Sequence, residues 1–140
     1  MTYLDERWIE VFQGGVSILV SSRDASHTPS AVRGLAWRYV ASSQRVTVIV
    51  DQLQAESVLA AISQTHTVAV VLSKPSTHQS VQLKSRNAKV SVAPASARGL
   101  AARQMGMFVA EVAPLGYAPP LIERSEEHTS ELQSHVRISY

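Results

Sequence analysis

The sequence predicts a mainly β domain with flanking helices (α+β), in which antiparallel strands close into a barrel. Runs of alternating or β-branched residues recur along the chain, and short polar turns separate consecutive runs. Consecutive strands joined by short turns pair in antiparallel fashion, and many short strands in a small chain favour a barrel or a sandwich. A length of 140 residues suits one domain, and an apolar content of 45% is enough to form a buried core.

Three segments of the chain have the apolar spacing of helices. Apolar residues recur at this spacing over residues 4–12, and Gly14 and Gly15 are expected to cap the end of that helix. A second helix is predicted over residues 52–64, where it would cover one end of the barrel. Pro94 opens an alanine-rich helix that reaches about residue 112.

Five segments have the alternation or the β-branched content of strands. They span residues 15–22, 30–40, 45–50, 65–73 and 78–92. In the second of these strands, alternation places Arg33 and Trp37 on one face and Arg38 on the other. The last strand is expected to be central, and four polar side chains follow one of its faces, namely His78, Ser80, Gln82 and Lys84.

Composition excludes several classes of protein. The chain has no cysteine, which excludes disulfides, thiolate metal sites and a cysteine nucleophile. No apolar run approaches the roughly 20 residues that a membrane-spanning helix needs. The net charge is only +2, and the basic residues are scattered, so no basic stripe indicates nucleic acid. We therefore expect a cytoplasmic protein that holds no metal and binds neither nucleic acid nor membrane.

The last seventeen residues differ in composition from the rest of the chain and have no apolar periodicity. They include the string RSEEHTSELQS, which is the in-frame translation of a common short-read sequencing adapter. A segment of such origin is set aside before the fold is considered. We therefore expect residues 1–123 to form the domain, with its C-terminal part missing, and residues 124–140 to be disordered or non-native.

Four strings, in order, cover most of residues 12–92. They are FQGGVSILVSSRD, TPSAVRGLAW, RVTVIV and VAVVLSKPSTHQSVQLKS. The last is the most specific, because it joins a strand to the turn Ser-Lys-Pro-Ser-Thr-His and then to Val-Gln-Leu-Lys. With this order of elements, the chain resembles the pyridoxamine 5′-phosphate oxidase-like family of split β-barrels, which bind flavin mononucleotide (FMN).

The resemblance implies a homodimer with FMN bound at the subunit interface and a small-molecule substrate. It implies that Arg33 contacts the flavin. Ser80 and Gln82 would lie on the strand that reaches the flavin ring or its phosphate. Ser57 would lie near the start of a helix, where the family often binds phosphate.

Each candidate residue also has a structural interpretation that the sequence leaves open. Arg33 has the fork that suits a phosphate, or it is a solvated strand arginine. Trp37 can stack on a ring, although a core or interface tryptophan is commoner. Ser57 lies a turn inside the predicted helix, which favours a surface serine. His78 suits a surface position beside a turn, and the polar face that ends at Lys84 fits solvent as well as ligand.

The sequence also departs from the family pattern. The segment DQLQAESV has no basic residue where the better-studied oxidases carry a phosphate clamp of Ser-Arg-Lys type. Two functions therefore stay open. The first is an FMN-dependent oxidoreductase of pyridoxamine 5′-phosphate oxidase-like type, in which the cofactor carries the redox chemistry. The alternative is a non-catalytic module, or one that binds haem or another cofactor, because a fold does not fix a function.

Overall fold

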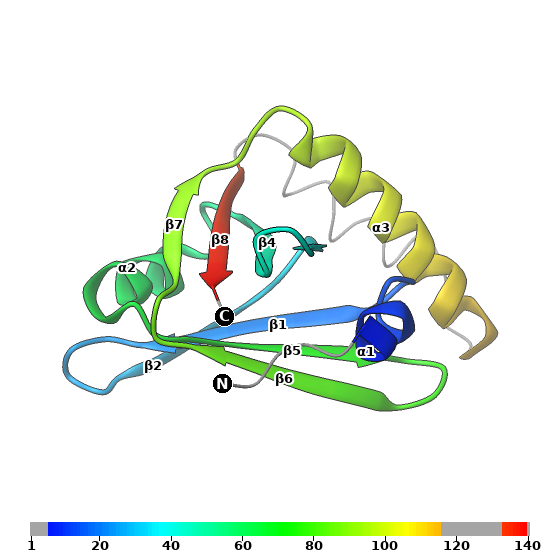
Figure 1. Ribbon diagram of the computed structural model, residues 1–140, viewed down its shortest axis with the longest axis horizontal. Coiled ribbons are helices and arrows are strands. Elements are labelled where there is room, and N and C mark those ends of the chain that lie inside the picture. The colour runs from blue at the N-terminus through cyan, green and yellow to red at the C-terminus, as the bar shows by residue number, and fades with distance from the viewer. Residues whose placement is uncertain (1–5, 116–132, 140) are drawn as a thin grey trace.

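The computed structural model describes residues 6–115 and 133–139, and in this part of the chain every strand pair is antiparallel (Figure 1). In the first sheet, the strand order is β2 (Pro29–Arg33), β1 (Ser17–Arg23), β5 (Val68–Lys74) and β6 (Gln79–Ser85). In the second sheet, it is β3 (Ala36–Val40), β4 (Arg45–Asp51), β8 (Gln133–Ser139) and β7 (Lys89–Val92).

Helices flank these two sheets. They are α1 (Glu6–Val11), α2 (Glu56–Thr65) and α3 (Ala97–Val112), and the short 3-10 helix η1 (Ala113–Leu115) follows α3. Figure 1 shows α2 at one end of the molecule, beside β7 and the β1–β2 hairpin, and α3 along the upper edge. The mainly β, antiparallel architecture with flanking helices is confirmed. Within the described residues, no helix has both the length and the apolar character needed to cross a membrane.

The two sheets enclose one hydrophobic core. Val20 and Val70 of the first sheet, and Val48 of the second, are fully buried in it. α2 closes the core with Val58 and Ile62, which are also buried. Each such side chain stabilises the fold by about 1.5–3 kcal/mol relative to an exposed position, so the core outweighs any single polar contact.

The predicted strand over residues 30–40 is two strands that belong to different sheets. β2 ends at Arg33, and the chain crosses to the second sheet at Gly34, whose N–H donates to the carbonyl of Ile18 at 2.9 Å. A side chain at Gly34 would collide with the Ile18 side chain, so glycine permits this close approach. The crossing places Arg33 on the outside of the first sheet and Trp37 in the core. The prediction that both share one face is therefore wrong.

The predicted strand over residues 78–92 also divides between the sheets. β6 ends at Ser85, and the hydroxyl of Ser85 accepts the N–H of Asn87 at 3.0 Å, which turns the chain. Ala88 is fully buried, and its N–H donates to the carbonyl of His66 at 2.9 Å before β7 begins in the second sheet. In the described sheet β6 is an edge strand, and not a central one as predicted.

The second helix begins four residues later than the sequence predicts. The carboxylate of Asp51 accepts the N–H of Leu53 at 2.8 Å and that of Gln54 at 3.3 Å, so these residues form a turn. An aspartate that bonds to backbone two or three residues ahead favours a turn over a helix. Asp51 is 4% exposed and is the one buried charged side chain among the described residues.

Gly14 and Gly15 do not cap α1. The helix ends at Val11, and neither glycine takes the left-handed conformation of a capping residue. Gly15 instead lies directly against the backbone of α3 at Met107 and Phe108. The absence of a side chain at Gly15 therefore sets how closely α3 approaches the start of β1.

Part of the predicted tail forms a strand of the second sheet. β8 pairs with β4 on one side and with β7 on the other, and its Val136 is fully buried opposite Val48 and Val90. Unpaired strand edges present rows of free backbone groups, which a strand between them satisfies. Residues 116–132 lie outside the described part of the chain. The boundary at residue 123 and the origin of the tail stay predictions.

Replacing Gly15 by alanine is expected to lower the free energy of unfolding. The new methyl group would have to displace the α3 backbone, and overpacking of this kind typically costs about 1–3 kcal/mol. Gly14→Ala is the matched control, since nothing lies within 4 Å of a methyl group there. Urea unfolding followed by circular dichroism measures both variants. Equal stability of the two would show that α3 does not press on Gly15.

Candidate functional site

A groove of about 580 Å³ lies between α3 and the outer face of β3 and β4. Its lining residues come from α1 and the loop after it, the two strands, and the start and middle of α3. They are Ile9, Gln13, Trp37, Arg38, Tyr39, Val40, Thr47, Ile49, Pro94, Ser96, Ala97, Leu100, Arg103 and Gln104. We call this the α3 groove. Its volume falls within the range of about 300–1,000 Å³ that small-molecule sites occupy.

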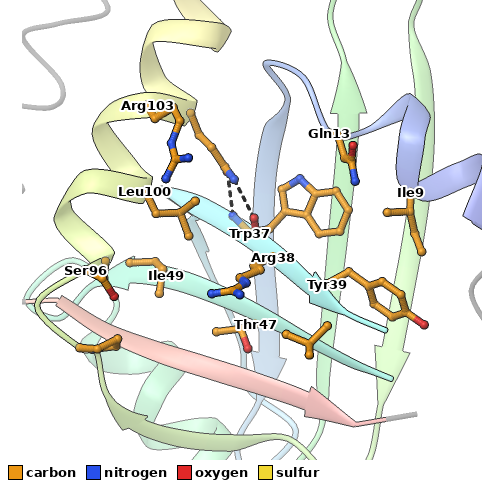
Figure 2. Close-up of a pocket in the computed structure, with 14 residues that line it drawn as sticks. Ile9, Gln13, Trp37, Arg38, Tyr39, Thr47, Ile49, Ser96, Leu100 and Arg103 are labelled. Atoms are coloured by element: carbon orange, nitrogen blue, oxygen red, sulfur yellow. Dashed lines mark hydrogen bonds between the residues drawn. The ribbon is translucent and has the colours of Figure 1, made fainter. Parts of the chain in front are cut away.

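The side chain of Gln104 fixes the wall of the α3 groove. Its Oε1 accepts the N–H of Trp37 at 2.9 Å, and its Nε2 donates to the carbonyl of Trp37 at 2.7 Å (Figure 2). The ring of Trp37 is anchored in turn, because its Nε1 donates to the carbonyl of Phe12 at 3.0 Å. These bonds set the position of α3 against β3.

Two arginines supply the charge of the α3 groove. Arg38 reaches from β3 and Arg103 from α3, and both side chains extend into the space between helix and sheet (Figure 2). The hydroxyl residues Thr47 and Ser96 lie beside them. No acidic residue occurs among the described residues that line the groove. The arrangement suits an anion with several acceptor oxygens, such as a phosphate group.

The start of α3 adds to this preference for anions. Pro94, Ser96 and Ala97 line the groove, so the N-terminal end of the helix borders the same space as the two guanidinium groups. The unpaired N–H groups and the dipole at a helix N-terminus favour a negative charge. The apolar side chains of Ile49 and Leu100 lie on the same side of the groove, near Ser96 and Arg103 (Figure 2). The groove therefore combines cationic and apolar side chains.

The loop after β4 offers no phosphate clamp. Asp51 occupies its start, and the carboxylate already accepts two backbone N–H groups. A buried carboxylate at this place disfavours a second anion by charge repulsion. Ser57, predicted as a phosphate contact, is exposed and is the second residue of α2, so it lies in the first turn and not inside the helix. It does not line the α3 groove.

Four of the predicted site residues lie together on the outer face of the first sheet. Arg33 pairs with Leu19, Leu19 with a residue of β5, and that residue with Gln82, so the row crosses all four strands. Leu19 is 45% exposed at the centre of the row. Ser80 and Lys84 flank Gln82 on the same side of β6. The first sheet thus brings Arg33, Ser80, Gln82 and Lys84 to one surface.

The remaining predicted residues are placed differently. Trp37 is 5% exposed and is the one predicted site residue that lines the α3 groove. His78 precedes β6, in a turn with φ of 59°, and its N–H donates to the carbonyl of Lys74 at 2.9 Å. Its side chain is exposed at that turn. Arg33 lies with its guanidinium carbon 5.8 Å from the ring centre of Phe108, on α3.

Sequence reasoning missed most of the α3 groove. The sequence placed Arg38 on the strand face opposite Trp37 without a role, and Arg103, Thr47 and Ser96 carried no signal of their own. Leu100 and Arg103 are three residues apart on a predicted helix, which indicates a shared face. That spacing does not indicate which surface the face would cover.

Solved structures with the same fold are found at low sequence identity, whereas no family model and no curated protein matches the sequence. A candidate pyridoxamine 5′-phosphate oxidase from Lactobacillus delbrueckii is 14% identical and has a TM-score of 0.56; the match covers 98% of this chain and 89% of that one. A single-residue variant of HupZ from Group A Streptococcus is 9% identical, with a TM-score of 0.52 and coverage of 99% and 96%.

A conserved hypothetical protein, Rv2991 of Mycobacterium tuberculosis, is 11% identical and has a TM-score of 0.53, with coverage of 96% of this chain and 79% of that one. At these identities the likeness concerns the fold. The chain has the split β-barrel fold of pyridoxamine 5′-phosphate oxidase-like proteins. This confirms the fold class that the sequence predicted.

Replacing Gln104 by leucine is expected to lower the free energy of unfolding and to loosen the α3 groove. The change leaves the N–H and the carbonyl of Trp37 without partners in a buried position, which costs about 1–3 kcal/mol for each unsatisfied group. Arg103→Leu, at the neighbouring exposed position, is the control. Urea unfolding and the near-ultraviolet circular dichroism of Trp37 measure both. Wild-type stability of Gln104→Leu would mean that these bonds do not hold α3.

Proposed function

We propose that this domain binds FMN, with the flavin phosphate in the α3 groove, and works as an FMN-dependent oxidoreductase of pyridoxamine 5′-phosphate oxidase-like type on a small-molecule substrate. One observation carries the proposal: Arg38 and Arg103 both line an anion-favouring groove, without an acidic residue in the described lining, on a split-barrel fold. The phosphate contact is thereby assigned to β3 and α3, and not to the loop after β4, where Asp51 lies.

The residues of the α3 groove fit such a cofactor. A flavin phosphate carries nearly two negative charges, and charge-assisted hydrogen bonds to arginine are about twice as strong as neutral ones. Beside these charged groups, Ile49 and Leu100 add apolar surface to the lining, which suits a flat, weakly polar ring. When bound, FMN supplies the hydride or electron transfer, whereas the chain binds it, orients it and excludes water.

Two surfaces of the chain point to a homodimer. The α3 groove lies on the second sheet, and the row from Arg33 to Gln82 lies on the outer face of the first. We propose that the first-sheet face of one protomer completes the site of its partner, which brings Arg33, Ser80 and Gln82 toward the flavin. Leu19, exposed at the centre of this face, supports the proposal, because a large apolar side chain there favours contact with another surface.

A second candidate function is a split-barrel module that binds haem or another cofactor, or that has no catalytic role. The observation that favours it is the loop after β4, where Asp51 takes the place of basic phosphate ligands. The two functions differ in spectrum, since bound haem gives a Soret band and bound flavin does not.

Arg38→Ala and Arg103→Ala are each expected to weaken FMN binding by tenfold or more. A hydrogen bond to a charged group contributes about 1.5–3 kcal/mol, and about 1.4 kcal/mol corresponds to tenfold in Kd. Quenching of FMN fluorescence on titration with protein measures the affinity. Arg23→Ala, which removes an exposed arginine on the β1–β2 hairpin, is the charge-matched control and should bind as the wild type does.

Absence of FMN binding in the wild-type protein would overturn the proposed function. A Soret band on addition of haem would then favour the second candidate. If FMN binds but Arg38→Ala and Arg103→Ala retain wild-type affinity, the phosphate lies elsewhere and the α3 groove is not the site.

Leu19→Glu is expected to convert a dimer into a monomer. A charge buried at the centre of an interface, without a partner, opposes association. Light scattering coupled to size-exclusion chromatography measures the mass. Leu53→Glu is the control, because Leu53 is 78% exposed in the loop before α2, away from the first-sheet face. A wild-type monomer, or an unchanged dimer in Leu19→Glu, would contradict the proposed interface.

A further inference from the structure

A second cavity, of about 640 Å³, opens on the outer face of the first sheet near the β1–β2 hairpin. Its lining comes from β1, the start of β2, β5 and the end of β6. The residues are Ser21, Ser22, Arg23, Pro29, Thr67, Val68, Ala69, Lys84, Ser85 and Arg86. We call it the hairpin cavity. None of its residues lines the α3 groove, which lies on the other sheet.

The register of the sheet explains how basic side chains gather there. Ser21 pairs with Ala69, and Ala69 pairs with Lys84, so these three lie in one row on the outer face. Arg23 lies two residues beyond Ser21 on β1, and Arg86 lies two residues beyond Lys84, just past the end of β6. Because side chains alternate between faces, residues two positions apart share this face.

Long basic side chains thus lie on both sides of β5, whose own side chains in the cavity are short. Ala69 and Thr67 of β5 form the floor, whereas Arg23 rises from β1, and Lys84 and Arg86 from β6 and its end. Strands β1 and β6 are two strand spacings apart, roughly 10 Å. Side chains of this length can span that gap and meet one anion between them.

The charged side chains that line the hairpin cavity are all positive. Three cationic residues line it, and the described lining includes no acidic residue. The carboxylate of Asp24 does not line the cavity, and its Oδ1 accepts the N–H groups of Ser26 at 2.8 Å and Thr28 at 2.9 Å within the hairpin turn. Nη1 of Arg23 lies 2.9 Å from Nδ1 of His27, which holds the guanidinium at the hairpin end.

We propose that the hairpin cavity is a binding site for a diphosphate group, either free or carried by a small molecule. Lys84 lies in the row of Ser21 and Ala69, whereas Arg23 lies two residues beyond Ser21 on the same face of β1, and positions two residues apart on one face are about 6.8 Å apart. Two linked phosphate groups can contact both cations, and arginine forks match phosphate oxygens in pairs. The cavity has room for more than the diphosphate group itself.

The proposal reassigns Lys84. The alternation along the predicted strand groups it with Ser80 and Gln82 as a candidate cofactor contact, whereas it lines the hairpin cavity and those two residues do not. The hairpin cavity shares no residue with the α3 groove, and it includes none of Arg33, Ser80 and Gln82, so substitutions in it test a site distinct from the proposed FMN contacts. It lies at the hairpin end of the first-sheet face, beside the row that contains Leu19.

Calorimetric titration of the full chain with inorganic pyrophosphate, at fixed ionic strength, tests the proposal. Lys84→Ala, Arg86→Ala and Arg23→Ala are each expected to raise the Kd for pyrophosphate by tenfold or more. Each variant loses at least one charge-assisted hydrogen bond, and the contribution of one such bond corresponds to about tenfold or more in Kd. Arg45→Ala is the matched control, because it removes an exposed arginine that lines neither the hairpin cavity nor the α3 groove, and it should bind pyrophosphate as the wild type does. FMN titration of the three variants should stay at wild-type affinity.

A comparison of ADP with pyrophosphate shows whether the diphosphate is free or part of an organic molecule. Tighter binding of ADP than of pyrophosphate would indicate a diphosphate carried by an organic molecule, whereas tighter binding of pyrophosphate would indicate the free anion. The proposal is overturned if the three variants bind pyrophosphate like the wild type, or if sodium chloride at equal ionic strength gives the same heat. Thermal unfolding of each variant shows whether it is folded, and a variant that is folded but unaffected also counts against the site.

Discussion

Two hydrogen bonds from one glutamine hold α3 against the second sheet. Gln104 bonds to both the N–H and the carbonyl of Trp37, in the middle of β3. The apolar contact that accompanies them is built largely from small side chains, because three of the four buried residues between helix and sheet are alanines. These four are Ala36, Ile49, Ala97 and Ala101, and Leu35, Ala93 and Leu100 pack against them. Alanine side chains bury little apolar area, so packing alone would position the helix weakly. The α3 groove exists because this polar clamp adds to that packing.

The clamp also explains how the barrel and the groove depend on each other. Trp37 faces inward, where its ring packs in the core and its Nε1 reaches the carbonyl of Phe12. Its backbone faces α3. Trp37 therefore contacts the N-terminal segment, the core and α3. Because neighbouring side chains of a strand point to opposite faces, Arg38, the next residue, points outward. A ligand in the α3 groove is held by a part of the chain that the core keeps rigid.

Much of the fold could be predicted from the sequence, and the errors have one physical cause. Alternation identified the strand segments, since each has one face in the core. It continued without interruption through Gly34 and through Ser85, so two strands were predicted where the chain changes sheets and forms four. Each crossing shifts by one residue which positions face inward, since Val32 and Trp37 both lie in the core on either side of Gly34. In the sequence, only the glycine and the turn residues mark the crossings. The late start of α2 also comes from turn residues, because the hydrogen bonds of Asp51 form a turn where the sequence predicts the first turn of the helix.

The candidate site was harder to predict than the fold. The alternation along β6 correctly grouped Ser80, Gln82 and Lys84, because a strand fixes which side chains share a face. The α3 groove joins Arg38 to Arg103, two residues that no local pattern relates. Their approach depends on which sheet α3 covers, and the hydrogen bonds of Gln104 decide that. Local periodicity cannot contain such information.

The central pair of the first sheet has a consequence for how the chain reaches this structure. β1 and β5 pair side by side, although the pairing of Ser21 with Ala69 joins residues 48 positions apart. The entropy of closing so long a loop has to be overcome before the first hydrogen bond of that ladder can form. Chains dominated by such distant pairings fold in milliseconds to seconds and not in microseconds. Newly made chains of this protein therefore expose the apolar faces of β1 and β5 for that time, and self-association competes with folding in this interval.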